Sequence, residues 1–147
     1  MRILIDADGC PVVDIALRHC KQFQVPCTIV CDTAHTFPDA YATVIVVDKG
    51  ADSADFAIAN RVRPGDIVVT QDYGLASMCL GRGARALHQD GWEYTAYNID
   101  ALLLARHESR RLRASGARMR GPKKRLPPQN AAFEKALLAL LQNTVQG

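Results

Sequence analysis

The sequence has few aromatic residues and lacks long apolar runs. Tyr, Phe and Trp make up 6% of its 147 residues, and Trp92 is the only tryptophan. The most hydrophobic stretch, residues 136–141, directly follows Glu134 and Lys135, so no window approaches the roughly 18 apolar residues of a membrane span. No basic region followed by a long apolar run opens the chain, so no secretory signal is expected. We therefore expect a cytoplasmic protein that does not contact membranes.

The cysteines fit no disulfide framework. There are five, an odd number, and no C-x-x-C pair is present. Cys27, Cys31 and His35 suggest a zinc site, but the intervening residues are typical of a strand, which would separate the two cysteines by about 13 Å. We expect buried free thiols instead.

Two common catalytic patterns are also missing. No Ser-His-Asp or Cys-His nucleophile set is apparent, and Gly81 and Gly83 are typical of a helix end rather than of a phosphate-binding loop. With 48% hydrophobic and 22% charged residues in 16.1 kDa, the composition is that of one globular domain spanning residues 1–147.

The hydrophobic pattern predicts an α/β fold. Apolar runs without alternation occur at residues 2–5, 27–31, 43–47 and 66–70, with weaker strand candidates at 84–87 and 93–97. Amphipathic helical patterns separate them, the first opening at Pro11 with Cys10 as its cap, the next two at 53–62 and 74–80. This alternation indicates a mostly parallel sheet of four to five strands with helices on both faces.

A C-terminal helical extension is predicted after the sheet. A helix is expected from residue 99 to about 113, capped by Asn98, followed by a Gly/Pro-rich loop through Pro128 and a last helix at 131–142. The last helix carries one apolar stripe, which would dock onto the domain or, alternatively, form a dimer contact: Phe133, Leu137, Leu140 and Leu141.

Positive charge is concentrated in residues 106–125. This basic segment holds nine Lys or Arg and one acid, Glu108, whereas the rest of the chain has nine basic and 14 acidic residues. Such asymmetry favours a polyanionic partner, most simply RNA, over a merely solvated basic face. The predicted nucleic-acid-binding residues are Arg106, Arg110 and Arg113, which share one helical face, together with Arg120, Lys123 and Lys124.

Aspartates fall where predicted strands end. Asp6, Asp32, Asp48 and Asp72 lie at or just after the ends of four strands, and the carboxyl ends of parallel strands meet at one edge of a sheet. Asp is also common in turns and helix caps, and this simpler explanation remains open for Asp32, Asp48 and Asp72.

Asp55 is less easily explained as a structural residue. It falls inside the apolar stripe of the helix predicted at 53–62, where an unpaired charge is costly, and Asp52 lies one turn earlier as a second acid or as the cap. If these carboxylates share a cleft, a cation must neutralise them, and hard oxygen ligands favour Mg²⁺ or Mn²⁺. The residues alone therefore give Asp6, Asp8, Asp55 and Asp72 as candidate metal-binding and catalytic residues.

Several motifs together resemble the YaiI/YqxD family of bacterial proteins over almost the whole chain. They lie at residues 6–12, 49–55, 65–76, 97–100 and 120–122. The family's fold is usually grouped with PIN-like nucleases, which hold Mg²⁺ or Mn²⁺ between acids at the ends of the first and fourth strands and on a middle helix. The resemblance implies these roles for Asp6, Asp72, and Asp55 or Asp52, with Asp8 as a further ligand or water-orienting base and Thr70 as a supporting hydroxyl.

The sequence therefore favours a divalent-metal-dependent ribonuclease. Two alternatives stay open. The first is a phosphatase of the haloacid dehalogenase type, because Asp6 and Asp8 after an apolar strand resemble its nucleophile and acid/base. The second is an RNA-binding module without catalysis, in which only residues 106–125 act.

Overall fold

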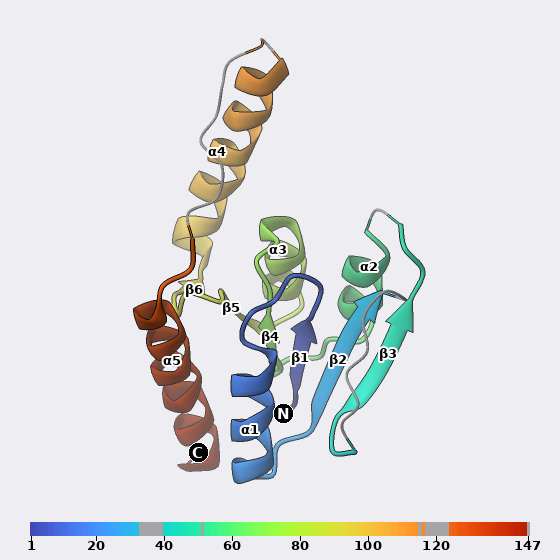
Figure 1. Ribbon diagram of the computed structural model, residues 1–147, viewed down its shortest axis with the longest axis vertical. Coiled ribbons are helices and arrows are strands. Elements are labelled where there is room, and N and C mark those ends of the chain that lie inside the picture. The colour runs from blue at the N-terminus through green and yellow to red at the C-terminus, as the bar shows by residue number, and fades with distance from the viewer. Residues whose placement is uncertain (33–39, 51, 115, 117–123, 147) are drawn as a thin grey trace.

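A six-stranded, mostly parallel sheet forms the centre of the computed structural model, which describes residues 1–32, 40–50, 52–114, 116 and 124–146 (Figure 1). The strand order is β3-β2-β1-β4-β5-β6. The strands are β1 (Ile3–Asp6), β2 (Cys27–Asp32), β3 (Thr43–Val47), β4 (Ile67–Val69), β5 (Arg85–Leu87) and β6 (Glu93–Tyr94). The predicted α/β class is confirmed. The sheet has one strand more than the four to five expected, because the short β6 pairs antiparallel with β5 at the edge.

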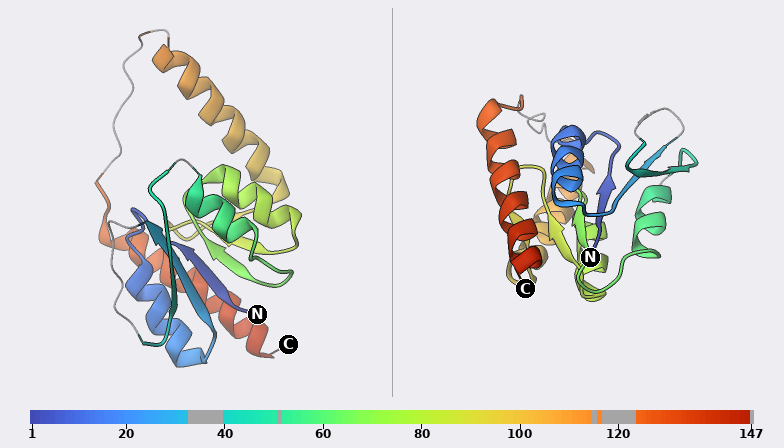
Figure 2. Two further views of the ribbon diagram at one scale, coloured as in Figure 1. Left: turned by 90° about the vertical axis from the view of Figure 1, so that its right-hand side faces the viewer. Right: turned by 90° about the horizontal axis from the view of Figure 1, so that it is seen from below.

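Helices cover both faces of the sheet, as predicted. Helices α1 (Val13–Phe23) and α5 (Pro127–Gln146) lie side by side on one face, and α2 (Ser53–Ala59) and α3 (Tyr73–Gly81) cover the other (Figure 2). Alternate strand residues point to opposite faces, so Ile3 and Ile5 of β1 join the core with α1 and α5, while Leu4 joins the core with α2 and α3. Buried aliphatic side chains on both faces hold the three layers together.

The last helix docks on the domain but is longer than predicted. Its stripe residues Phe133, Leu137, Leu140 and Leu141 are all buried in the core with α1, which confirms the docking interpretation. The helix begins at Pro127 and ends at Gln146, so the expected loop through Pro128 and the 131–142 bounds were wrong. Proline is tolerated in a first helical turn, and the Gln129 side chain accepts a hydrogen bond from the backbone N–H of Leu126 (2.6 Å).

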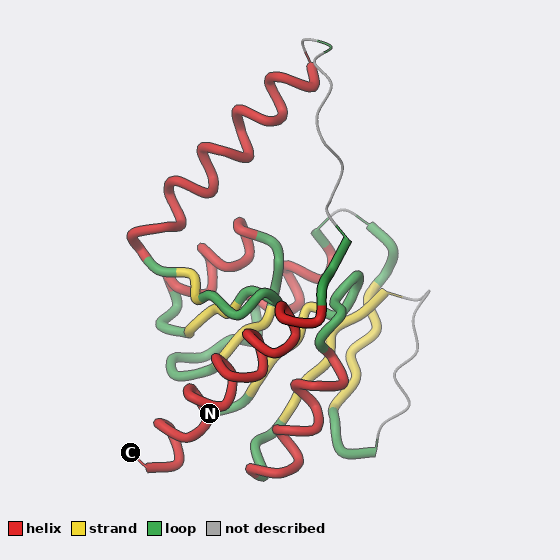
Figure 3. The backbone as a smooth tube through the Cα atoms, turned by 60° about the vertical axis from the view of Figure 1, so that its left-hand side comes forward, coloured by secondary structure: helices red, strands yellow, loops and turns green. Residues whose placement is uncertain are grey.

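Helix α4 (Ala96–Ala114) projects away from the sheet (Figure 3). It begins before Asn98, which was wrongly expected to cap it. Thr95 stands at the cap instead: the Asn98 side chain accepts a hydrogen bond from the Thr95 N–H (2.9 Å), and the Thr95 hydroxyl accepts one from the Asn98 N–H (3.3 Å). This reciprocal arrangement is a capping box. In the described part of the chain, no helix has both the length and the apolar character needed to cross a membrane.

The first helix also starts later than expected. Its N-cap is Val12, so Cys10 is not the cap and Pro11 is not the first helical residue. The Cys10 N–H instead closes a turn on the Ala7 carbonyl (3.0 Å), and Gly9 has a φ of +70°, which only glycine adopts without strain. None of the five cysteines is joined in a disulfide, as predicted, and four of them are buried whereas Cys10 is half-buried. Cys27 and Cys31 lie on β2, while His35 lies outside the described residues.

The strand order places a switch point between β1 and β4. From β1 the chain adds β2 and then β3 on one side, and it continues with β4, β5 and β6 on the other. In open α/β sheets such a reversal leaves a crevice at the carboxyl ends of the two central strands. The arrowheads of β1, β2 and β3 point to the same edge of the sheet as the base of α4 (Figure 1). This edge contains the acidic residues singled out in the sequence.

Candidate acidic centre

Asp6, Thr70 and Asp72 form a linked group at the switch point. Asp6 is the last residue of β1, and Thr70 directly follows the neighbouring β4. The Thr70 hydroxyl donates to Asp6 Oδ2 (2.9 Å), and Thr70 Oγ1 accepts a hydrogen bond from the Asp72 N–H (3.0 Å). Asp72 Oδ1 in turn caps α3 by accepting from the Leu75 N–H (3.0 Å). Thr70 is buried, so these bonds hold both acids in fixed positions.

Asp55 approaches this group from helix α2. Asp52, Asp55 and Asp72 line a pocket of about 310 Å³ together with Phe56, Gly74 and Met78. Asp55 interacts electrostatically with Asp6, Asp52 and Asp72 and shares a hydrogen bond with the Asp72 side chain. The structure thus brings together Asp6, Asp55 and Asp72 from three separate elements, as the sequence pattern predicts.

Two of these carboxyl groups have raised pKa values. Burial, which is the largest cause, and the negative charges of Asp72, Asp6 and Asp52 together raise the pKa of Asp55 from 3.8 to about 6. Burial also raises the pKa of Asp6, and Asp72 and Asp8 add to the rise, whereas the hydrogen bond from Thr70 opposes it. The centre therefore holds more negative charge than its surroundings neutralise.

Asp52 and Asp8 occupy different positions. Asp52 stands at the N-cap position of α2 with a φ of +68°, but its side chain makes no cap hydrogen bond, so it is the cap by position only. Its carboxylate lines the pocket instead. Asp8 lies beyond the end of β1, and both of its oxygens accept hydrogen bonds from the Asp32 N–H (3.2 and 3.0 Å). Asp8 thus links the ends of β1 and β2.

The carboxylates are neighbours without forming a closed ligand set. Among the residues that the structure describes, no three His, Cys, Asp or Glu side chains are arranged as a metal-binding group. Asp72 is partly engaged as a helix cap, and Asp6 is held by Thr70.

Aromatic side chains border the acidic centre. Phe56, next to Asp55, is 59% exposed at the pocket. On the other side Tyr73 packs edge-on against Tyr94 (ring centroids 6.0 Å apart), whose hydroxyl donates to the Thr70 carbonyl (3.2 Å). Neither Phe56 nor Tyr94 was singled out from the sequence. Phe56 could have been found, because it lies off the apolar stripe of its helix, whereas no local signal placed Tyr94 here.

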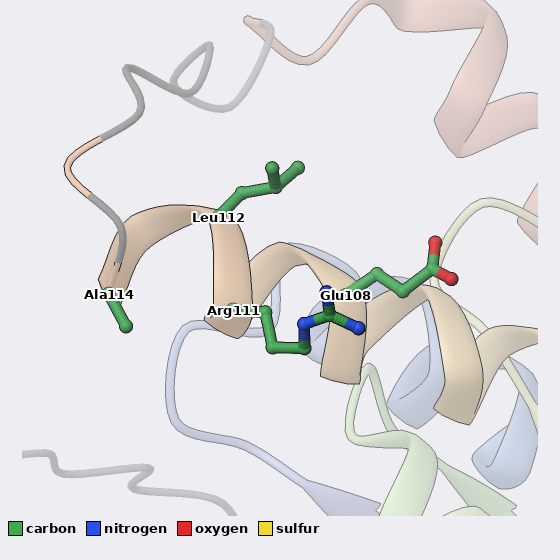
Figure 4. Close-up of a pocket in the computed structure, with 4 residues that line it drawn as sticks. All are labelled: Glu108, Arg111, Leu112 and Ala114. Atoms are coloured by element: carbon green, nitrogen blue, oxygen red, sulfur yellow. The ribbon is translucent and has the colours of Figure 1, made fainter.

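Part of the basic segment lies on α4. The helix includes residues 106, 110 and 113 in one continuous stretch, which confirms the predicted helical spacing, and Arg110 is exposed. Lys124 is also exposed, while Arg120 and Lys123 lie outside the described residues. Near the end of α4, a pocket of about 350 Å³ is lined by Glu108, Arg111, Leu112 and Ala114 (Figure 4). The described residues that line it all lie on α4, and none of them belongs to the acidic residues at the switch point.

Arg125 has a structural role that its place in the basic segment did not reveal. Its guanidinium donates to Asp90 Oδ1 (2.6 Å), to the Gln89 carbonyl (2.7 Å) and to Asn130 Oδ1 (2.6 Å). These bonds fasten the start of α5 to the turn between β5 and β6. Gly91 lies in this turn with a φ of +91°, and its backbone approaches Ala132 so closely that no Cβ would fit.

Comparison with known proteins identifies the family. The family model described as "Uncharacterized BCR, YaiI/YqxD family" matches residues 4–143. A UPF0178 protein of Exiguobacterium sibiricum is 51% identical over 141 residues, which cover 96% of both chains. A UPF0178 protein of Ruminiclostridium cellulolyticum is 47% identical over 147 residues, which cover 100% of this chain and 96% of the relative. The chain therefore belongs to the YaiI/YqxD family, as the motifs at residues 6–12 and 65–76 indicated.

Proposed function

We propose that this protein is a divalent-metal-dependent nuclease that hydrolyses RNA phosphodiester bonds. One observation carries the proposal: Asp6, Asp55 and Asp72, remote in sequence, meet at the switch point of the sheet, and burial and mutual repulsion raise the pKa values of Asp6 and Asp55. A cluster of this kind disfavours its own charged state, and a bound cation removes that penalty.

The donor set fits Mg²⁺ or Mn²⁺. The grouped ligands are carboxylate oxygens, which hard divalent cations prefer over the thiolates and imidazoles typical of zinc sites. Asp6, Asp55 and Asp72 would hold the ion, with Asp52 as a further oxygen ligand at the same pocket. The bound cation would polarise a phosphodiester and lower the pKa of a water molecule for in-line attack.

The protein's own residues contribute position and charge. Thr70 fixes the Asp6 carboxylate through Oδ2 and leaves Oδ1 for a ligand. The α3 cap uses Oδ1 of Asp72, which orients that side chain at the start of the helix. Asp55, with a pKa of about 6, accepts or releases a proton near neutral pH, so it would exchange its proton for a cation readily. A nuclease assignment also agrees with the resemblance of the family fold to PIN-like nucleases.

The surroundings suit a polyanionic strand. Helix α4, which carries the exposed Arg110, rises from the same edge of the sheet as the acidic centre (Figure 1). Basic side chains beside an acidic metal site attract phosphates that the acids alone would repel. The exposed ring of Phe56 offers a base-stacking surface at the pocket.

The phosphatase alternative is less well supported. It assigns proton transfer to Asp8, but both Asp8 oxygens accept from the Asp32 backbone, and Asp55 has no part in that chemistry. The alternative of RNA binding without catalysis leaves the grouped acids and their raised pKa values without a role.

The test is Mn²⁺-dependent cleavage of single-stranded RNA by wild-type protein and by an Asp6→Asn, Asp72→Asn double variant. Both substitutions keep an oxygen acceptor, so Thr70 can still bond residue 6 and Asn can still cap α3. Removing two ligand charges should lower the cleavage rate by at least about a hundredfold.

Asp100→Asn is the control, because Asp100 is exposed on α4 and this substitution removes a carboxylate charge outside the acidic centre. This variant should cleave RNA like wild type. Cleavage that the double variant retains in full would overturn the nuclease proposal. RNA affinity that is steeply salt-dependent but unaffected by chelation, without any cleavage by wild type, would favour the binding-module alternative.

A further inference from the structure

A second pocket lies at the opposite end of the sheet from the acidic centre. Its volume is about 470 Å³, and it is formed where strands β1, β2 and β3 begin and where the chain leaves α2. Arg2 precedes β1 and Asp6 ends it, so roughly 13 Å of strand separates the two sites. The pocket is therefore distinct from the proposed nuclease centre.

The pocket is lined mainly by groups that donate hydrogen bonds to anions. Its polar lining consists of Arg2, Thr28, Thr43, Asn60, Arg61 and Arg63. None of the described residues that line it is acidic, although the chain outside residues 106–125 is acidic on balance. A concave surface with guanidinium, hydroxyl and amide donors is complementary to an oxyanion.

The buried residue Asp66 forms hydrogen bonds with two of the arginines that line this pocket. Asp66 is buried, and its carboxylate accepts hydrogen bonds from the Arg2 side chain (3.1 Å), the Arg2 N–H (3.2 Å) and the Arg63 N–H (2.9 Å). The Arg2 guanidinium also donates to the Arg61 carbonyl. One buried carboxylate thus holds Arg2 and the 61–63 loop together and neutralises a single positive charge.

Two arginine charges are left for a ligand. Arg61 donates one N–H to the Ala57 carbonyl (2.9 Å), which leaves most of its five donors unused. In the described ranges, no acidic side chain forms an ion pair with Arg61 or Arg63. Both residues are exposed at the pocket, so their repulsion would be relieved by a bound anion.

We infer that this pocket binds a small organic phosphate of about mononucleotide size. The two free guanidinium groups, with Thr28, Thr43 and Asn60, match the oxygens of a phosphate group. A volume of about 470 Å³ is in the range of small-molecule sites and is much larger than inorganic phosphate alone requires. Ile45 and Val62 add apolar lining for the rest of the ligand.

The experiment is a set of separate titrations of metal-free wild-type protein with UMP, uridine, ribose 5-phosphate and inorganic phosphate. Amide chemical shifts in NMR spectra measure the binding of each ligand. UMP and ribose 5-phosphate should shift residues 28, 43 and 60–63, with weaker binding of inorganic phosphate and none of uridine. Arg61→Gln together with Arg63→Gln should weaken UMP binding by about tenfold or more, the loss expected for charge-assisted hydrogen bonds.

Arg82→Gln is the matched control, since Arg82 is exposed and lies outside both the pocket and the basic segment. It should bind UMP like wild type. Equal binding of uridine and UMP, shifts confined to α4, binding of an RNA strand only, or affinity unchanged in the Arg61→Gln, Arg63→Gln variant would each overturn the inference. The titration uses metal-free protein, whereas the cleavage assay requires Mn²⁺. A failure of UMP binding is therefore distinguishable from a failure of the nuclease proposal.

Discussion

Replacing Asp55 by Asn should stabilise the metal-free protein, although it removes a residue of the proposed centre. A rise in pKa from 3.8 to about 6 corresponds to about 3 kcal/mol of unfavourable interaction in the ionised state. Asp55 is only partly buried, so solvent screening reduces this to about 1 to 2 kcal/mol. An Asn amide can still donate to Asp72, which preserves the hydrogen bond between the two side chains.

The effect should depend on pH with a defined sign. The folded protein holds the Asp55 proton at pH values where the unfolded chain has lost it, so wild-type stability falls as pH rises from about 4 to about 6. The variant should therefore match wild type at pH 4 and exceed its melting temperature by about 3 to 6 °C at pH 7.5.

Thermal unfolding in EDTA, and again with Mn²⁺, measures both effects. Manganese should raise the melting temperature of wild type more than that of the Asp55→Asn protein, because the variant has lost one ligand. Asp100→Asn, an exposed carboxylate change, should behave like wild type throughout. A variant less stable than wild type at pH 7.5 in EDTA would refute the argument that repulsion dominates at Asp55.

Three further predictions follow from the packing of named residues. Thr70→Val should cost about 1 to 3 kcal/mol in denaturant unfolding, because the half-buried Asp6 carboxylate and the Asp72 N–H both lose a partner, whereas Thr70→Ser should be milder; equal losses would contradict this role. Gly91→Ala should destabilise by at least about 2 kcal/mol, since its Cβ would lie 2.5 Å from the Ala132 backbone, while Gly81→Ala, with open space around it, should be neutral or stabilising. Phe56→Ala should raise the KM for RNA severalfold with little change in melting temperature, because the ring is 59% exposed; an unchanged KM would remove its stacking role.

The sheet could be predicted because its central strands are mostly apolar and buried. Residues 27–31 are all buried, which is typical of a parallel strand between helices. Residues 43–47 are also mostly apolar, although β3 lies at the edge of the sheet and is partly exposed. The helix ends were predicted less well. Thr95 and Asn98 are both good caps, and only the reciprocal hydrogen bonds show that Thr95 is the one used. Likewise, Pro127 and Pro128 favour a loop in the sequence, whereas in the structure they form the first two residues of α5.

The acidic centre could be predicted in outline because strand direction gathers residues at the ends of strands. Asp6 and Asp72 follow this rule, and Asp55 was recognisable as a charge within an apolar stripe. The orientation of each carboxylate could not be predicted. Asp8 turns to the Asp32 backbone, and Asp52 leaves its helix uncapped, because these choices depend on tertiary hydrogen bonds. The basic pocket was missed for the same reason: Arg2, Thr28 and Arg61 become neighbours only through the strand order.

The most direct test of the acidic centre is anomalous diffraction from a crystal of the wild-type protein soaked in Mn²⁺. The account predicts an anomalous peak at the switch point, with carboxylate oxygens of Asp6, Asp55 and Asp72 at about 2.0 to 2.3 Å from the ion. Asp52 and Asp55 should have rotated toward it. A crystal in which manganese occupies other sites, while these carboxylates keep the positions described for the metal-free protein, would contradict the central claim.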